Sequence, residues 1–504
     1  MILVIDVGTS STKFLLMDEQ GTICYIASKK YTLQYPSRGA VTMDINHFTS
    51  HLKNGLVEVG THCTQEGIAL AGISVTSQRS SIIPVARDGS PLSHALMWQD
   101  TRSQEICDVL FEHIDEIRNI CAMVMTPLYS APKIAYLRET MNEVYQAADK
   151  LVGFSEYTLF QLTGAWVTDT SIASRTALFD IKSLRWSPEL LDIFNIEEKK
   201  LCPLTAVGSL IDLTTGEMTR LLGQSSPVPV FSAGGDQQCA ALGNGTLVSG
   251  DISANFGSGA YVFGLCDHPI IPEDKRVVCN VSAMAQKWQI ESSFSSCGMT
   301  LDWVDRILFK KADEPHPYAN FMDASRSVPI GSNGVRFSIH LAGMKNKEGD
   351  TTSYGGIFNI RNGTTRDDLA RSVLEGIAIS FDAHLDLVKK ELEQKRHEIN
   401  ISGGLTRDLF FNQMLSSMVG LNLVTLDNPE ATASGAWIST ATRLGLHASE
   451  VEAFSTMAQR LAKTRYSPDH RDYGEYRRIK DELNQLIDSI THNVNGGYQY
   501  VKNQ

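Results

Sequence analysis

The sequence predicts an α/β protein made of two related halves, and three observations support this fold class. Strand-like apolar runs alternate with helix-like patterns throughout the 504 residues. Glycine-rich turns follow several of the predicted strands. A segment near residue 5 recurs near residue 254, almost half the chain later. A prior of about 150 residues per domain would suggest three or four domains, but the recurrence favours two halves.

The first half opens with strands. Residues 2–6 form a continuous apolar run, which is typical of a buried strand. A second strand is predicted over 13–18, and the turn at 18–21 leads into a third over 22–27. Near the end of this half, a strand over 228–231 precedes a helical stretch over 239–242.

The recurrence aligns Gly8 with Gly257 and Thr9 with Ser258, an offset of 249 residues. Both segments have the pattern strand, tight turn, strand. A match this short can arise by chance. Its position, almost halfway along the chain, nevertheless indicates duplication.

Helices are the strongest elements of the second half. Thr365 and Asp368 form a capping pattern before a segment whose apolar residues share one face. A strand over 398–401 leads through a double glycine into a helix from about 406 to 418. A polar helix follows Tyr473.

Composition excludes several classes of protein. The formal net charge is −12, which argues against a nucleic acid or an anionic membrane as the partner. The nine cysteines include no CxxC pair, which indicates reduced thiols rather than a disulfide or zinc framework. No basic leader precedes the first strand, and no apolar run approaches the roughly 18 residues of a membrane helix. We therefore expect a soluble, cytoplasmic protein.

The stretch from Asp6 to Lys13 is the sharpest candidate for a functional motif. Gly8 lets the backbone approach a ligand closely, and successive N–H groups with hydroxyls can form an anion cradle. Asp6, at the end of the first strand, can hold Mg²⁺ directly or through water. The alternative is a hairpin turn rich in small residues.

A second motif is Gly234-Gly235-Asp236-Gln237-Gln238, which follows a strand and precedes a helical stretch. A carboxylate at this position could accept a proton from a substrate hydroxyl. The alternative role of Asp236 is that of an ordinary helix N-cap.

Two glycine-rich segments in the second half have the same character. Gly257-Ser258-Gly259 would form a second phosphate turn, and Gly403-Gly404 lies between a strand and a helix, where a nucleotide can contact the backbone. A plain β-to-α turn is the alternative for the double glycine.

Several blocks in a fixed order carry a resemblance that spans nearly the whole chain. They are residues 6–13, Thr76-Ser77-Gln78-Arg79 with Trp98-Gln99-Asp100-Thr101-Arg102, Gly234-Gly235-Asp236-Gln237-Gln238, Gly403-Gly404 and the stretch 430–436. In this order they resemble the FGGY carbohydrate kinase family, which includes glycerol kinase, xylulokinase and gluconokinase.

The resemblance implies two actin-like (ribonuclease H-like) ATPase domains, with mixed sheets flanked by helices around a central cleft. Residues 1–245 would form the sugar- or polyol-binding domain, and residues 246–504 the nucleotide-binding domain. The implied activity is ATP-dependent phosphorylation of a hydroxyl on a small sugar or polyol, xylulose-like or glycerol-like, with ATP and Mg²⁺ as cofactors. The oligomeric state stays undetermined, with a homodimer as one possibility.

The resemblance also implies roles for individual residues. Asp236 would be the general base, and Asp6 the Mg²⁺ and phosphate-side carboxylate. The acceptor pocket would contain Gln78, Arg79, Trp98, Asp100 and Gln237. The nucleotide and its phosphates would contact Gly8, Thr9, Ser10, Ser11, Lys13, Gly257, Ser258, Gly403, Gly404 and Asp408.

The sequence departs from the family pattern at two places. Ser80 stands where a glutamate follows the arginine in glycerol kinases, and the stretch 341–350 replaces the usual Arg-Pro-aromatic segment. Two other hypotheses therefore stay open, namely an actin-like ATP-binding switch and a regulatory pseudokinase. A switch would not need a polar sugar pocket that contains Arg79 and Asp100.

Overall fold

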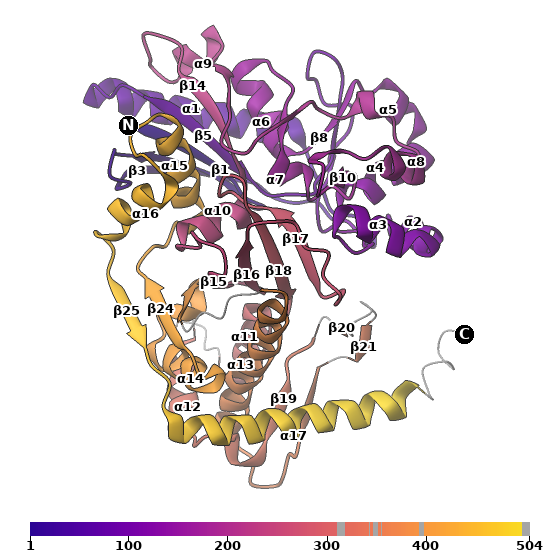
Figure 1. Cartoon of the computed structure of the whole chain (residues 1–504), viewed down its shortest axis with the longest axis vertical. Helices are drawn as coiled ribbons and strands as arrows, with labels where there is room; N and C mark the ends of the chain where they lie inside the picture. The colour runs from indigo at the N-terminus through magenta and orange to yellow at the C-terminus, as the bar shows by residue number, and fades with distance from the viewer. Residues whose placement is uncertain (310–317, 342, 346–350, 354, 393–397, 496–504) are drawn as a thin grey trace.

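Two mixed sheets, one in each of two stacked lobes, organise the computed structural model (Figure 1). The structure describes residues 1–309, 318–341, 343–345, 351–353, 355–392 and 398–495. The first sheet has the order β13-β14-β5-β1-β2-β3. Its strands are β1 (Ile2–Val7), β2 (Ser11–Met17), β3 (Ile23–Lys30), β5 (Gly72–Ser77), β13 (Leu210–Leu213) and β14 (Pro229–Gly235).

The second sheet has the order β17-β18-β16-β15-β23-β24-β25. Its strands are β15 (Ile252–Phe256), β16 (Ala260–Cys266), β17 (Val277–Val281), β18 (Trp288–Phe294), β23 (Glu398–Ser402), β24 (Asn422–Leu426) and β25 (Lys463–Tyr466).

The two sheets share one pairing pattern. In the first, β1 pairs antiparallel with β2 and parallel with β5, and β5 pairs parallel with β14. In the second, β15 pairs antiparallel with β16 and parallel with β23, and β23 pairs parallel with β24. The strands β2 and β16 start and end at positions related by the predicted offset of 249 residues. The structure thus confirms the duplication.

Strand β1 is buried on both faces, as its unbroken apolar run predicts. Its odd-numbered residues pack against helix α1 (Ile45–Glu66) in one hydrophobic cluster. Ile2 and Val4 pack in another cluster against helix α15 (Ala431–Arg443), which the second half of the chain supplies. The first lobe is therefore completed by a segment near the C-terminus, and helix α16 (Glu450–Ala458) lies beside α15 (Figure 1).

Helices α15 and α10 (Asp236–Gly243) pack against each other at close range. A Cβ atom on Gly435 would lie 1.9 Å from the carbonyl oxygen of Cys239, and one on Gly243 would lie 1.9 Å from that of Ala431. Glycine at both positions lets the two helix backbones meet where the lobes join.

The second lobe contains the predicted helices with shifted ends. Thr365 and Asp368 form the predicted capping box at the start of α13 (Arg366–Glu391). The double glycine leads first into a 3-10 turn, η4 (Gly404–Arg407), and only then into α14 (Leu409–Val419). The terminal helix is α17 (His470–Asn495). Helices α11 (Gly298–Leu308) and α12 (Ala319–Ser327) complete this lobe.

Further short elements fill the connections. The helices are α2 (Gln104–Val109), α3 (Ile114–Cys121), α4 (Ser130–Thr140), α5 (Asn142–Ala147), α6 (Phe154–Thr163), α7 (Thr170–Ala173), α8 (Pro188–Phe194), α9 (Gly216–Leu221), η1 (Leu110–His113), η2 (Glu198–Lys200) and η3 (Ser332–Gly334). The strands are β4 (Thr42–Met43), β6 (Ile83–Val85), β7 (Ala95–Leu96), β8 (Lys150–Val152), β9 (Thr168–Asp169), β10 (Phe179–Asp180), β11 (Arg185–Trp186), β12 (Leu204–Thr205), β19 (Arg336–Ser338), β20 (Met344–Lys345), β21 (Thr351–Ser353) and β22 (Gly356–Phe358).

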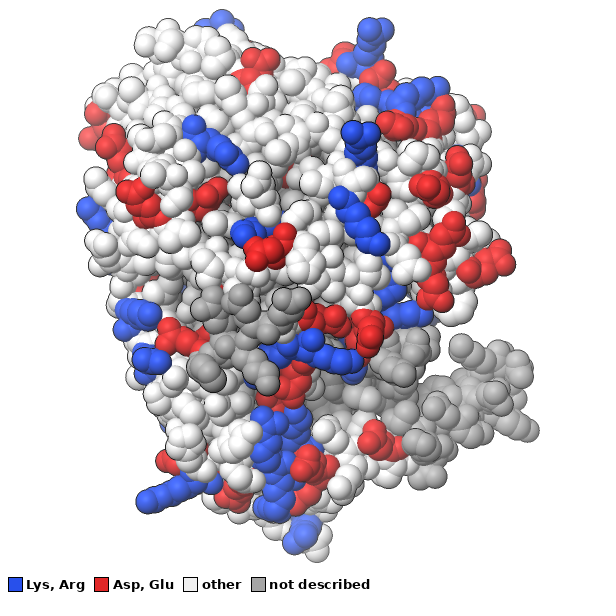
Figure 2. All heavy atoms as spheres, viewed as in Figure 1, with Lys and Arg blue, Asp and Glu red and all other residues white. Residues whose placement is uncertain are grey.

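Of the departing stretch 341–350, residues 342 and 346–350 lie outside the described residues. Acidic and basic side chains are interspersed over both lobes on the face shown in Figure 2. Among the described residues, no helix combines the length and apolar character needed to cross a bilayer.

Candidate active site

The ends of three neighbouring parallel strands bring the main candidate residues together. Strand β5 lies between β1 and β14, with Thr76 opposite Asp6 and Ser77 opposite Gly235. Gln78 and Arg79 follow β5 directly, and Asp236 follows β14 as the first residue of α10. Because carboxyl ends of parallel strands meet at one edge of a sheet, side chains far apart in sequence converge there.

Arg79 is the centre of this cluster. Its Nε lies 3.2 Å from Oδ1 of Asp236, and its Nη1 lies 3.3 Å from Oε2 of Glu291. The same Nη1 donates to Oε1 of Gln238 at 3.2 Å. The guanidinium is buried, whereas the Asp236 side chain keeps 24% of its surface exposed. Asp236 is therefore held by one arginine and still open to a ligand.

Glu291 belongs to β18 in the second lobe, so the cluster joins the two lobes. Its Oε1 lies 3.7 Å from Nη1 of Arg175, which also donates to Oδ1 of Asn280 at 3.3 Å. The Arg175 guanidinium stacks over the ring of Tyr129 at 5.1 Å. Two arginines and two carboxylates thus form one mostly buried network.

Electrostatics distinguish the two candidate aspartates. Burial raises the pKa of Asp6 to about 7, and the carboxylates of Asp236 and Glu430 add to the rise, while Lys13 opposes it. Burial also raises the pKa of Asp236, and Arg79 works against that rise. Asp6 therefore lies where negative charge exceeds positive charge, an arrangement that favours a cationic ligand.

The turn after β1 is held by its carbonyl groups. Gly8 N–H donates to Ser11 O at 3.0 Å, and Tyr31 N–H donates to Ser10 O at 3.0 Å. The carbonyl of Gly8 accepts from the hydroxyl of Tyr31 and, at 3.1 Å, from Nε2 of Gln78. The N–H of Gly8 and the carbonyls of Gly8, Ser10 and Ser11 are thus bonded within the protein, and the role of this turn as an anion cradle stays a prediction.

Two predicted side chains meet beside this turn. The indole Nε1 of Trp98 donates to Oγ1 of Thr9 at 3.0 Å. The acceptor-pocket candidate and the phosphate-turn candidate are therefore neighbours.

Lys13 reaches from the first lobe to a residue that the second half of the chain supplies. Its Nζ lies 2.7 and 2.6 Å from the two carboxylate oxygens of Glu430, the N-cap residue of α15. Lys13 is also the register partner of Asp6 across the β1–β2 hairpin. Lys13, which is predicted to bind phosphate, therefore already has a carboxylate partner in Glu430.

The second predicted turn is built in the same way. Gly257 and Ser258 are exposed, and their carbonyls accept from N–H groups at the start of α11, including Gly298 at 3.1 Å and Met299 at 3.0 Å. Gly403 has φ +108°, and a Cβ there would lie 2.4 Å from the carbonyl oxygen of Phe256. Only glycine fits so close to the end of β15.

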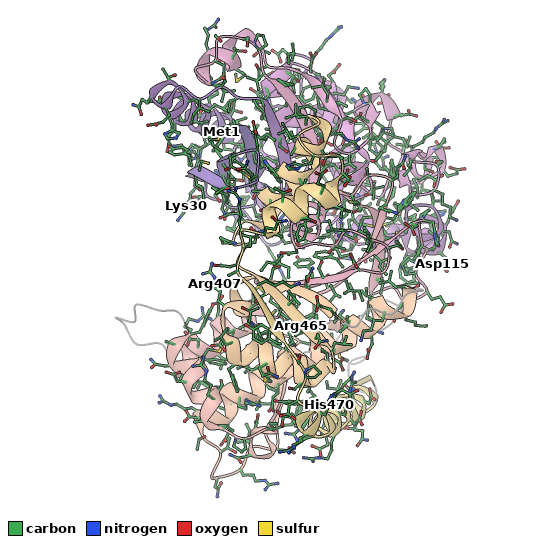
Figure 3. All side chains as sticks on the ribbon, turned by 60° about the vertical axis from the view of Figure 1, so that its left-hand side comes forward. Met1, Lys30, Asp115, Arg407, Arg465 and His470 are labelled. Carbon is green, nitrogen blue, oxygen red and sulfur yellow. The ribbon has the colours of Figure 1, made fainter. Side chains whose placement is uncertain are left out.

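The turn after Gly403 faces open space. Nothing lies within 4 Å of a Cβ built on Gly404. Figure 3 places Arg407, at the end of η4, near the level at which the two lobes meet. The glycine-rich segments 257–259 and 403–404 of the second lobe therefore adjoin each other, close to the first lobe.

Two predicted site residues have full sets of internal partners. Asp100 is buried and accepts from Val41 N–H at 2.9 Å and from Arg102 Nη2 at 2.7 Å. Asp408 caps α14 by accepting from Phe411 N–H at 2.9 Å and also pairs with Arg326. Their predicted contacts with ligands stay predictions.

Gln237 differs, because its Oε1 is buried without a partner among the described residues. Ser80, the residue that departs from the glycerol kinase pattern, has φ +68° and donates its hydroxyl to the carbonyl of Arg175 at 3.1 Å. It therefore binds backbone rather than presenting a free polar group.

Sequence reasoning missed Glu291, Arg175 and Glu430. No local signal marks Glu291, because its burial follows from the packing of β18 in the folded protein. Glu430 begins one of the blocks that carry the family resemblance, whereas Arg175 lies outside the blocks quoted above.

Both halves of the chain match domains of known proteins. Residues 1–243 match the N-terminal domain, and residues 252–444 the C-terminal domain, of the FGGY family of carbohydrate kinases. A glycerol kinase of Mycoplasmoides gallisepticum is 26% identical over 449 residues, 86% of this chain and 87% of the relative. A xylulose kinase of Staphylococcus epidermidis is 25% identical over 491 residues, 96% of this chain and 97% of the relative.

Solved structures share the fold over almost the full length. The gluconate kinase of Lactobacillus acidophilus superposes with a TM-score of 0.89 at 24% identity, covering 97% of this chain and 98% of its own. The glycerol kinase of Plasmodium falciparum, solved with ADP, has a TM-score of 0.86 at 22% identity and covers 97% and 98%. With both domains matched in order, the chain belongs to the FGGY family of carbohydrate kinases.

Proposed function

We propose that this carbohydrate kinase transfers the γ-phosphoryl group of ATP to a hydroxyl of a small sugar or polyol, xylulose-like or glycerol-like. The observation that carries the proposal is the convergence of Asp6, Arg79 and Asp236 at one edge of the first sheet. The named relatives, glycerol and xylulose kinases, support this acceptor class.

In this proposal Asp236 is the general base. It accepts the proton of the acceptor hydroxyl as that oxygen bonds to the γ-phosphorus, and ADP leaves with the electron pair of the broken P–O bond. A base in this position accelerates transfer by about 10²–10⁴-fold. The acceptor would be oriented by Arg79, Gln78, Trp98, Asp100 and Gln237.

The nucleotide would lie on the second lobe. Gly403 and Gly404 would face it, while the turns at residues 8–11 and 257–258, together with Lys13, would hold its phosphates. The ADP in the Plasmodium falciparum glycerol kinase supports a nucleotide for this chain too. Residues 1–245 would then be the acceptor domain and residues 246–504 the nucleotide domain.

The residues present fit a Mg²⁺ ion. Among the described residues no three acidic, His or Cys side chains gather into a metal cage. Kinase sites hold Mg²⁺ by only one or two carboxylates, completed by phosphates and water. Asp6 has such a carboxylate; burial is the main cause of its raised pKa, and the nearby carboxylates of Asp236 and Glu430 add to the rise. Bound there, Mg²⁺ would neutralise charge on the transferring phosphoryl group.

The test is ADP release from the purified protein with MgATP and a panel of polyols, ketoses and aldonates. We expect acceptor-dependent ADP release with at least one of them. Binding of ATP without release on any acceptor would favour the ATP-binding switch or the pseudokinase, and would refute the proposal.

A further inference from the structure

The network around Arg79 has no net charge. Two guanidinium groups, of Arg79 and Arg175, face two carboxylates, of Asp236 and Glu291. Glu291 contacts both arginines, at 3.3 and 3.7 Å. Two neighbouring arginines would otherwise suit an anionic ligand, because guanidinium groups bind carboxylates well.

Glu291 remains a carboxylate in this environment. Its side chain is only 4% exposed, and burial alone would raise its pKa. Arg175 and Arg79 outweigh that effect and hold the pKa below its usual value. Its negative charge therefore persists at neutral pH, and water screens it little.

The polar atoms left over in the network are mainly neutral. The Oε1 of Gln238 accepts a hydrogen bond from Arg79, and the Oδ1 of Asn280 accepts one from Arg175. The Nε2 of Gln238, the Nδ2 of Asn280 and the Nε of Arg175 are buried without a partner among the described residues. Gln237 adds an unpartnered acceptor, its Oε1. Unpaired donors together with an unpaired acceptor in consecutive glutamines suit hydroxyl groups, which both donate and accept.

We propose that Glu291 sets the charge class of the acceptor, so that the site takes an uncharged polyhydroxylated molecule and disfavours one that carries a carboxylate. This proposal rests on the proposed kinase function and narrows the class of acceptor molecules to uncharged ones. An acceptor carboxylate near either arginine would also lie close to Glu291 or Asp236, and like charges repel strongly at a buried site.

The experiment uses pairs of compounds that differ in one terminal group, namely glycerol and glycerate, xylitol and xylonate, glucitol and gluconate. For the wild-type protein and Glu291→Gln we would measure kcat/KM by ADP release, and affinity by calorimetry with each compound. We expect the wild type to prefer the neutral member of each pair that it accepts. Glu291→Gln should shift the ratio toward the carboxylate by at least about tenfold.

Two further variants separate charge from general damage. Glu375→Gln removes another glutamate of the second lobe, which is equally buried and pairs with Arg371 at 2.9 Å. It should leave the neutral-to-anionic ratio unchanged. Glu291→Asp keeps the charge and should keep the wild-type preference, even if Glu291→Gln folds poorly.

Two results would overturn the inference: tighter binding of the carboxylate member by the wild type, or an unchanged ratio in a folded Glu291→Gln variant. Failure of the kinase proposal is distinguishable, because it would appear as no ADP release with any compound. The calorimetric preference for neutral or anionic members would then still decide the role of Glu291.

Discussion

Asp236→Asn tests the proposed base directly, because the structure predicts that little else changes. Asparagine has the same shape, and its Oδ1 can still accept from Gln237 N–H, which now lies at 2.7 Å. Arg79 keeps its contacts with Glu291 at 3.3 Å and Gln238 at 3.2 Å. The cluster should therefore stay folded while it loses the group that accepts the proton.

The substitution should have two effects. Removing the base should lower kcat by about 10²–10⁴-fold. The lost negative charge should also lower the pKa of Asp6, since Asp236 is among the groups that raise it to about 7. A lower pKa keeps Asp6 ionised to more acidic pH, so Mg²⁺-dependent nucleotide binding should persist at pH 6 better than in the wild type.

The assay combines ADP release with calorimetric titration of MgATP at pH 6, 7 and 8. Asp382→Asn is the matched control, because Asp382 is buried and pairs with Arg477 and Lys480 away from this site. We expect full nucleotide affinity at pH 8 for Asp236→Asn. Equal losses of nucleotide affinity and kcat would refute the role of base and indicate a structural helix-start residue.

Three further predictions concern other parts of the fold. Exchanging Lys13 and Glu430 for each other should keep the ion pair, and hence the melting temperature. If the ammonium group binds phosphate, the exchange should raise KM for ATP by about tenfold. An unchanged KM would show that Lys13 has only a structural role. Gly435→Ala should destabilise the protein by about 1–3 kcal/mol, because its Cβ would lie 1.9 Å from the backbone of α10; thermal denaturation beside Gly474→Ala, whose Cβ meets nothing within 4 Å, checks this. Burial lowers the pKa of His384 to about 3, so below about pH 6.5 the unfolded chain binds a proton that the native state does not. The free energy of unfolding should therefore fall by about 1.4 kcal/mol per pH unit below that value. Urea denaturation at pH 7 and pH 5 checks this, because the difference in unfolding free energy between the two pH values should be smaller for His384→Gln.

The hairpins and their duplication could be predicted from sequence because they are local. Strand, tight turn and strand follow one another within some 16 residues, and the offset of 249 residues aligns β2 with β16 from end to end. Asp236 could be placed for the same reason, since strand, double glycine and helix are contiguous.

The partners of Arg79 could not be predicted in this way. Glu291 lies 212 residues further along the chain, and only the packing of β18 against the first lobe brings it near. For Asp100 a local signal was available, because Arg102 is two residues away and the Asp-x-Arg spacing indicates a local ion pair. A helix's apolar face likewise does not reveal which sheet it will cover, so the place of α15 was unforeseen.

The position of α15 constrains the order in which the chain can fold. Ile2 and Val4 pack in one cluster with Trp437 and Met457, which follow them by more than four hundred residues in the chain. The growing chain must therefore carry a sheet with one apolar face uncovered until α15 has been made. A fragment that ends near residue 245 would keep that face exposed, so the two halves of this kinase are expected to fold together rather than as independent domains.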